Sequence, residues 1–348
     1  MSEPEHYSFC VLLTGAATPL HKCARVVEGD GRLRDVTMHK AATMYYLQGQ
    51  TMESIAAHLH TSRSSVSRLL SQARESGIVR ISVAPLEETG SHLARQLHEA
   101  FGVHAWVVPV RPGASQVRRL SQVAAVAAEN FMQMIAPGMV VGFAWGNTTA
   151  EVIRHIPRRE IPDVTLVQLN GAASHETTGV PYVGAIMAEA AAALGARSVH
   201  FPVPAFFDYA ETKQAMWREG SIRQVLDLQR RCSLALFGVG GLTAEIPSHV
   251  YSQGYLSRED LNALDADRVV GDVCTVFIRE NGTYRGIELN QRASGPTPDE
   301  LRRIDRRLCV VAGPAKAPAL LGALRAQVAT DLVVDEQTAR QVVRLAQK

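Results

Sequence analysis

Short apolar strands alternate with helices along most of this chain, and this alternation constrains the fold more than any other feature. The strand-like runs are residues 105–110, 139–143, 164–169, 198–203, 233–237, 269–278, 308–311 and 331–334. Helical patterns separate most of them, at residues 116–135, 182–194, 258–264 and 318–328. This arrangement is typical of a parallel sheet that helices cover on both faces. The sequence therefore predicts a Rossmann-like α/β domain.

A different pattern precedes this domain, in residues 51–77. Thr51 is predicted to be the N-cap of one short helix and Ser62 the N-cap of a second, which Gly77 ends as its C′ residue. Each helix has one apolar face at helical spacing. Two amphipathic helices joined by a turn are common in helical proteins, so this pattern alone predicts DNA binding only weakly.

The exposed face of the second helix adds to that prediction. Its polar residues near the N-terminal end are Arg63, Ser64, Ser65, Ser67 and Arg68. A recognition helix meets base edges and phosphates with this part of its surface. Residues 37–84 hold five Lys and Arg against two Glu, whereas the whole chain has a net charge of +2. A basic module on a near-neutral chain favours phosphate contact at one end, so we predict a helix-turn-helix that binds operator DNA.

Four loops that follow predicted strands contain the residues of a candidate ligand site. They are residues 142–149 (GFAWGNTT), 169–172 (LNGA), 237–241 (FGVGG) and 310–318 (VVAGPAKAP). Ligands of open α/β sheets bind beyond the carboxyl ends of the strands. Each Gly-rich loop alone is explained as an ordinary turn, but four in one domain favour a pocket for a polyol or a sugar phosphate.

The first loop suits an anion, above all a phosphate. Gly146 permits a tight turn, and Asn147, Thr148 and Thr149 then present amide, hydroxyl and backbone N–H groups at a helix N-terminus.

The other loops supply further polar groups. Asn170 can bond a hydroxyl group, and Gly171 allows the backbone to approach a ligand closely. Lys316 follows a strand near a helix start, where its ammonium group can meet an anion.

On these residues the chain resembles the SorC-type sugar-sensing transcriptional regulators. The matching segments, in the same order, are residues 51–83, 142–148, 169–172, 237–241, 271–282 (GDVCTVFIRENG) and 310–339. The resemblance runs from about Met38 to the end of the chain. The family pattern often has Gly where this chain has Ala144, Ala172 and Pro314.

The resemblance implies an N-terminal helix-turn-helix followed by a domain similar to sugar-phosphate isomerases and deaminases. It implies a homo-oligomer, a tetramer or a dimer, with phosphorylated sugars as the common effectors. It also implies phosphate contacts from Gly146, Thr148, Thr149 and Lys316, and a hydroxyl contact from Asp272. On the sequence alone, Asp272 is equally explained as a plain turn residue before a strand.

We therefore expect four parts: a disordered extension (1–36), the DNA-binding domain (37–84), a linker (85–90) and an effector-binding and oligomerisation domain (91–348). No apolar run approaches the ~20 residues of a membrane-spanning helix. The apolar run at residues 9–17 is short for a signal peptide, and acidic residues precede it. The five cysteines form no metal or disulfide pattern, which favours a reducing cytoplasm.

The predicted function is a DNA-binding regulator whose operator affinity a sugar, a polyol or a sugar phosphate controls. The alternative is an isomerase-like or deaminase-like enzyme that carries a DNA-binding head. Proton transfer would need an acid or base near the pocket, and Asp272 is the strong acidic candidate in the matched loops. Because no base-and-partner pair accompanies it, we predict a protein without catalytic activity, cofactor or metal.

Overall fold

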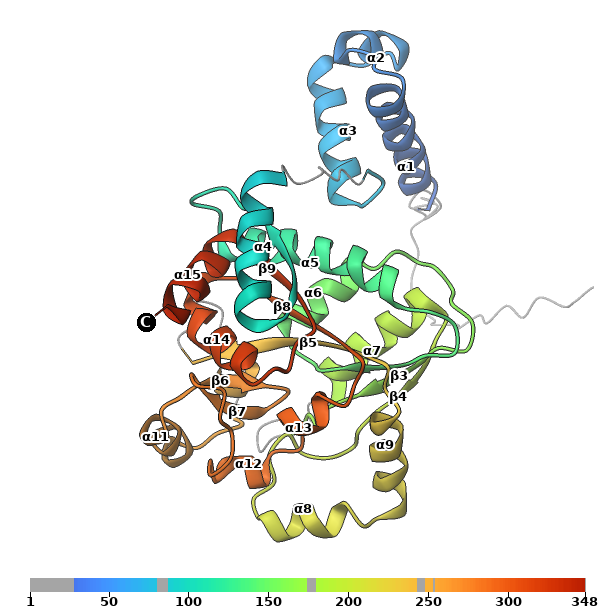
Figure 1. Cartoon of the computed structure of the whole chain (residues 1–348). Helices are drawn as coiled ribbons and strands as arrows, with labels where there is room; N and C mark the ends of the chain where they lie inside the picture. The colour runs from blue at the N-terminus through green and yellow to red at the C-terminus, as the bar shows by residue number, and fades with distance from the viewer. Residues whose placement is uncertain (1–27, 80–86, 174–179, 243–247, 253, 348) are drawn as a thin grey trace, which may run out of the picture. The chain divides into compact units, whose positions relative to one another are not determined.

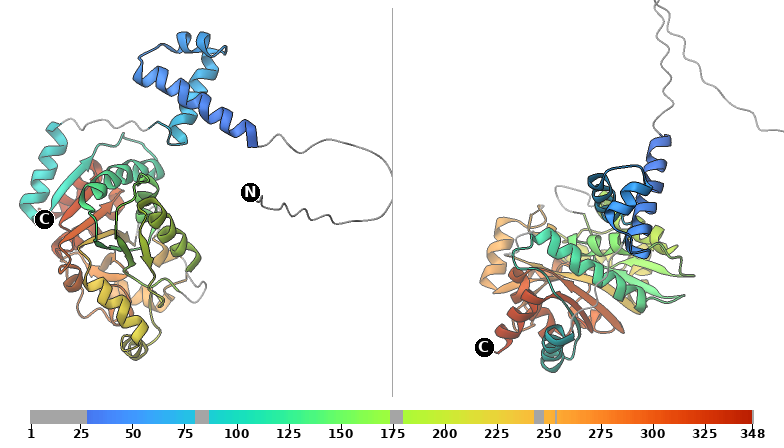
Figure 2. Two further views of the ribbon diagram at one scale, coloured as in Figure 1. Left: turned by 90° about the vertical axis from the view of Figure 1, so that its right-hand side faces the viewer. Right: turned by 90° about the horizontal axis from the view of Figure 1, so that it is seen from above.

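The computed structural model describes residues 28–79, 87–173, 180–242, 248–252 and 254–347. The chain divides into two compact units, Met1–Ala84 and Pro85–Lys348. Figures 1 and 2 draw both units.

The N-terminal unit is helical. Its elements are α1 (Glu28–Ala42), a π-helical turn (Thr43–Leu47), α2 (Met52–His58) and α3 (Arg63–Glu75). The apolar faces of these helices enclose a small core of their own, which includes Met44, Ile55, Val66 and Leu70. This unit therefore buries an apolar interior without using the sheet of the second unit.

Local capping explains where α2 and α3 begin and end. The side chain of Thr51 accepts a hydrogen bond from the N–H of Ser54, and that of Ser62 accepts one from Ser65, as N-caps do. Gly77 follows α3 with a φ of +77°, the left-handed conformation that favours glycine at C′. These sequence-based predictions are confirmed.

Two expected boundaries differ from the limits of the helices. Helix α1 begins at Glu28, inside the extension that was expected to be disordered to residue 36, and α4 (Glu87–Phe101) begins inside the expected linker 85–90. Residues 28–36 carry no apolar stripe, so nothing in their pattern marks a helix. Starting a helix is costly, but each residue added to a formed helix gains one hydrogen bond. A formed helix can therefore extend into such a segment. Residues 1–27 lie outside the described part of the chain.

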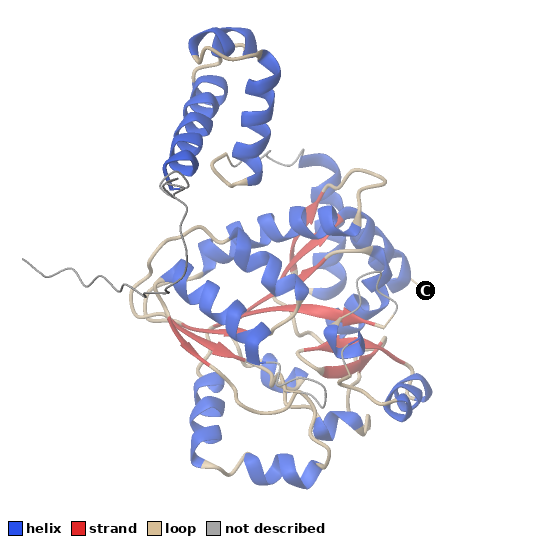
Figure 3. Cartoon of the chain, turned by 180° about the vertical axis from the view of Figure 1, so that it is seen from behind, coloured by secondary structure: helices blue, strands red, loops and turns tan. Residues whose placement is uncertain are grey.

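The second unit is built on a parallel sheet, shown in red in Figure 3. The strand order is β1-β9-β8-β5-β2-β3-β4, and all these pairs are parallel. The strands are β1 (His104–Val108), β2 (Val140–Phe143), β3 (Thr165–Gln168), β4 (Arg197–Val199), β5 (Leu234–Gly241), β8 (Arg306–Val311) and β9 (Asp331–Asp335). The predicted α/β class is confirmed.

Helices cover both faces of this sheet and enclose two apolar cores. On one face lie α5 (Gln116–Met134), α6 (Asn147–His155) and α7 (Val180–Leu194). On the other lie α4, α9 (Gly220–Arg230), α14 (Ala317–Arg325) and α15 (Glu336–Ala346). The shorter helices are α8 (Ala210–Met216), α10 (His249–Ser252), α11 (Arg258–Ala266), α12 (Leu289–Arg292), α13 (Pro298–Leu301) and a 3-10 turn (Pro314–Lys316).

Residues 269–278, predicted as one strand, instead form a β-hairpin. Strand β6 (Val269–Val273) pairs antiparallel with β7 (Val276–Arg279) and with the end of β5. The two residues of the turn, Cys274 and Thr275, have φ values of +51° and +69°. Sequence patterns miss this turn because hairpins of this kind normally carry Asn-Gly or Asp-Gly.

Candidate functional site

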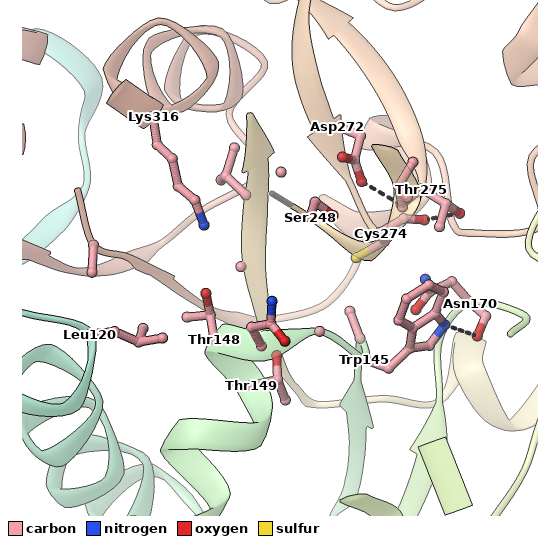
Figure 4. A pocket seen from close by; sticks show the side chains of 18 of the residues that line it. Leu120, Trp145, Thr148, Thr149, Asn170, Ser248, Asp272, Cys274, Thr275 and Lys316 are labelled. Carbon is pink, nitrogen blue, oxygen red and sulfur yellow. Dashed lines mark hydrogen bonds between the residues drawn. The ribbon is translucent and has the colours of Figure 1, made fainter. Parts of the chain in front are cut away.

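The strand order creates a crevice between β2 and β5. From β2 the chain continues to β3 and β4 on one side, and it then returns to add β5 on the other side. Such a switch point is where open α/β sheets bind ligands. A cavity of about 690 Å³, including its open mouth, lies there, and Figure 4 shows its lining side chains.

The cavity gathers seven of the eight residues predicted to contact the effector: Gly146, Asn147, Thr148, Thr149, Asn170, Asp272 and Lys316. They follow β2, β3 and β8 or, for Asp272, lie in β6, so only the folded sheet brings them together.

Gly171 is the exception, since it is not among the described residues that line the cavity. A Cβ atom at Gly171 would lie 2.2 Å from the carbonyl oxygen of Pro204. Its N–H donates to Ser294 Oγ at 2.9 Å, and its carbonyl oxygen accepts from Trp145 Nε1 at 2.8 Å. The close approach that requires glycine is therefore to the chain's own backbone, and a ligand contact at Gly171 stays a prediction.

The N-terminus of α6 faces the cavity and is suited to an anion. Gly146, its N-cap residue, has a φ of +153°, and no side chain in the described residues caps the helix. The first N–H groups of a helix have no partner within the helix and carry the positive end of its dipole. Thr148 and Thr149 lie in this turn, and Thr149 is only 2% exposed. Together these groups form a set of hydrogen-bond donors.

Contacts outside the loop orient Asn147 as a further donor. Its side-chain oxygen Oδ1 lies 2.7 Å from His249 Nε2 and accepts from the Tyr182 hydroxyl at 3.4 Å. Since an amide oxygen is an acceptor, Nε2 of His249 carries the proton. The amide NH₂ group of Asn147 is then the part that remains to donate to a ligand.

Lys316 adds a positive charge to the same cavity. It ends the 3-10 turn after β8 and precedes α14. Burial lowers the pKa of Lys316, and the nearby Asp272 carboxylate opposes this shift. A bound anion would act in the same direction as Asp272 and favour the charged ammonium group.

Asp272 lies in β6 opposite Gly240 and Phe277, and it is 5% exposed. Its carboxylate accepts hydrogen bonds from the Tyr251 hydroxyl at 2.9 Å and from the N–H of Thr275 at 3.1 Å. Burial raises the pKa of Asp272, while these two bonds and Lys316 lower it. The side chain thus holds the turn and also lines the cavity.

Asn170 is 1% exposed, and its Oδ1 atom has no hydrogen-bond partner within the described part of the chain. A buried acceptor without a partner is costly, and at a cavity wall it is ready to accept from a ligand. In Figure 4, Asn170 and Asp272 are drawn on the side of the cavity opposite Lys316.

Several lining residues were not among those predicted to contact a ligand. Gln116 and Leu120 come from α5, and Ser248 precedes α10. These three belong to none of the segments singled out in the sequence, so only the tertiary structure identifies them. Cys274 and Thr275, which form the hairpin turn, lie in the segment 271–282 that matches the family, but no sequence pattern places them in a site.

The close fit around Asp272 leads to a prediction for Gly240. A Cβ atom there would lie 1.9 Å from Asp272 Oδ1, so Gly240→Ala must displace the carboxylate. We expect the free energy of unfolding to fall by about 1–3 kcal/mol, measured by thermal melting. Gly184→Ala in α7 is the control, because nothing lies within 4 Å of its Cβ position. If both variants melt alike, Asp272 is not confined as described.

The residues predicted to contact DNA lie on α3. Arg63, Ser64, Ser67 and Arg68 are exposed, and Arg63 forms an ion pair of 2.8 Å with Glu53 on α2. Ser65 is half-buried, and its hydroxyl lies 2.9 Å from Ser62 Oγ. Four of the five are thus accessible, whereas Ser65 belongs to the helix cap.

The described residues hold neither a membrane-spanning helix nor a three-ligand metal site. No helix there combines the length and the apolar character needed to cross a membrane. No group of three His, Cys, Asp or Glu side chains in those residues is placed to hold a metal ion.

Comparison with known proteins gives the family. Residues 87–344 match the family model described as "Putative sugar-binding domain". A domain of a possible sugar-binding transcriptional regulator from Arthrobacter aurescens TC1 is 46% identical, with a TM-score of 0.69, over 75% of this chain and 100% of that one.

Two relatives extend the similarity to nearly the whole chain. The full-length sorbitol operon regulator SorC from Klebsiella pneumoniae is 25% identical, with a TM-score of 0.66, over 89% of this chain and 99% of that one. The deoxyribonucleoside regulator of Bacillus subtilis (strain 168) is 29% identical over 304 residues, which are 87% of this chain and 96% of that protein. The chain therefore belongs to the SorC-type family of sugar-binding transcriptional regulators.

Proposed function

We propose that this protein binds operator DNA through α2 and α3 and that a phosphorylated sugar or polyol in the cavity controls the affinity. The observation that carries the proposal is the division of the cavity into two sides. One side offers donors and a positive charge from the start of α6 and from Lys316. The other offers the acceptors Asn170 Oδ1 and the Asp272 carboxylate. A molecule with a phosphate at one end and hydroxyl groups at the other matches both sides.

The proposed mechanism is allosteric. The second unit forms a homo-oligomer, a dimer or a tetramer, which presents paired α3 helices to two half-sites of a near-palindromic operator. The oligomer has two arrangements of its subunits, which differ in operator affinity. The effector changes this affinity by at most the difference between its own binding free energies for the two arrangements. In this mechanism the partners of the protein are operator DNA and the effector. Because the DNA of a bacterial regulator lies in the cytoplasm, we propose that the protein acts there.

Enzymatic activity is the second candidate, and the lining of the cavity argues against it. Asp272 is the one carboxylate and no His occurs among the described lining residues. Proton transfer on a sugar phosphate would need an acid and a base at separate positions, so we propose a sensor without catalysis.

Thermal melting against sugars, polyols and their phosphates tests this function. A ligand at 100 times its Kd stabilises the folded protein by about 2.7 kcal/mol, which corresponds to a shift of about 5 °C or more. We expect phosphorylated compounds to give this shift and their free sugars to give much less. A shift with free polyols alone would contradict the phosphate assignment, and no shift with any compound would contradict the effector site.

A further inference from the structure

The turn between β6 and β7 has a strained backbone, and it lines the cavity. Cys274 and Thr275 both have positive φ values, +51° and +69°, and neither is glycine. A β-branched residue such as Thr275 is rarely found in this conformation. Strained backbone persists where the surroundings hold it firmly, and it is concentrated at functional sites.

One contact within the turn and one from a distant segment hold this turn. The Thr275 hydroxyl donates to the carbonyl oxygen of Cys274 at 2.5 Å. Gly295 packs against the same carbonyl so closely that a Cβ atom there would lie 1.7 Å from the oxygen. The turn is therefore fixed before any ligand binds.

The strained conformation directs the N–H of Thr275 to the Asp272 carboxylate, at 3.1 Å from Oδ2. The Tyr251 hydroxyl donates to the other oxygen, Oδ1, at 2.9 Å. Each carboxylate oxygen has two acceptor sites, so one site on each remains after these bonds. Both carboxylate oxygens are thus fixed in place with acceptor capacity left over.

A second acceptor at the same cavity is fixed in a comparable way. The backbone carbonyl of Asn170 accepts from Trp145 Nε1 at 3.2 Å and from Gln168 Nε2 at 2.7 Å. These bonds hold the main chain, while the side-chain Oδ1 atom is buried without a partner in the described residues. Asn170 follows β3 and Asp272 lies in β6, and both side chains line the same cavity.

We propose that Tyr251 and Thr275 are positioning residues, which hold the Asp272 carboxylate in the orientation that lets it discriminate between effectors with and without hydroxyl groups. The inference rests on the proposed function, in which Asp272 and Asn170 accept from hydroxyl groups of the effector, and it adds the residues that set this specificity. A site built to accept from hydroxyl groups rejects analogues that lack them, because its buried acceptors then stay unpaired.

The test compares two phosphates with the same six-carbon chain, sorbitol 6-phosphate and hexyl phosphate, by calorimetry on the full chain. Wild-type protein is expected to bind sorbitol 6-phosphate at least tenfold more tightly than hexyl phosphate. Tyr251→Phe keeps the ring and removes the hydroxyl, and we expect it to reduce this preference about tenfold. Its affinity for inorganic phosphate is expected to stay unchanged, since the α6 end of the cavity is intact.

Tyr284→Phe is the matched control, because the Tyr284 hydroxyl donates to another carboxylate, that of Asp299, at 2.6 Å. It should leave the preference as in wild type. Equal binding of both phosphates by the wild type, or an unchanged preference in Tyr251→Phe, overturns the inference while the phosphate site stands. A wild type that binds neither probe nor inorganic phosphate overturns the proposed function, and the inference with it.

Discussion

Replacement of Lys316 by Met is expected to weaken binding of a phosphorylated effector about 10- to 100-fold and to leave operator affinity unchanged. A hydrogen bond to a charged group contributes about 1.5–3 kcal/mol, and this ammonium group is the cation among the described residues that line the cavity. Operator affinity should persist, because residue 316 belongs to the second unit and the proposed DNA contacts belong to the first. The measurements are effector titration by calorimetry and DNA binding with and without effector.

Lys213→Met is the matched control for this result. Lys213 is also half-buried, and burial lowers its pKa as it does that of Lys316. Its ammonium group lies 5.4 Å from the centre of the Trp217 ring, and it does not line the cavity. The control should bind effector normally. If Lys316→Met itself responds to effector as the wild type does, the anion site has been placed wrongly.

The second large effect is expected at Arg68. Its side chain is exposed on α3, whereas the neighbouring Arg63 is held by Glu53. We expect Arg68→Ala to reduce affinity for operator DNA at least tenfold and to lower the slope of log K against log salt by about 1, as loss of one phosphate contact does. DNA selected from a random pool by the wild-type protein serves as the probe.

Arg74→Ala tests whether position or only charge matters. Arg74 is exposed in the last turn of the same helix, so its removal changes the net charge equally. We expect a much smaller loss of affinity from this variant, and both variants should keep the thermal shift with effector. Equal losses from the two would mean that α3 does not insert its N-terminal end into the groove.

Features that depend on neighbours along the chain could be predicted from the amino-acid sequence. Alternating apolar strands and helices predicted the α/β class because burial on two faces leaves a pattern in every strand. Thr51, Ser62 and Gly77 predicted the limits of α2 and α3, since a cap acts within three residues of itself. The loop at Gly146 was found for the same reason: a strand, a glycine and a helix start follow one another directly.

Side-chain orientations and packing contacts that depend on residues far apart in the chain appear only in the folded structure. Asn147 is oriented by Tyr182 and His249, which are 35 and 102 residues away. Gly171 packs against Pro204, and Gly295 packs against the Cys274–Thr275 turn, so no local pattern reveals either contact. Local propensity fixes the elements, whereas the polarity of the cavity arises only when the ends of several strands meet at one edge of the sheet.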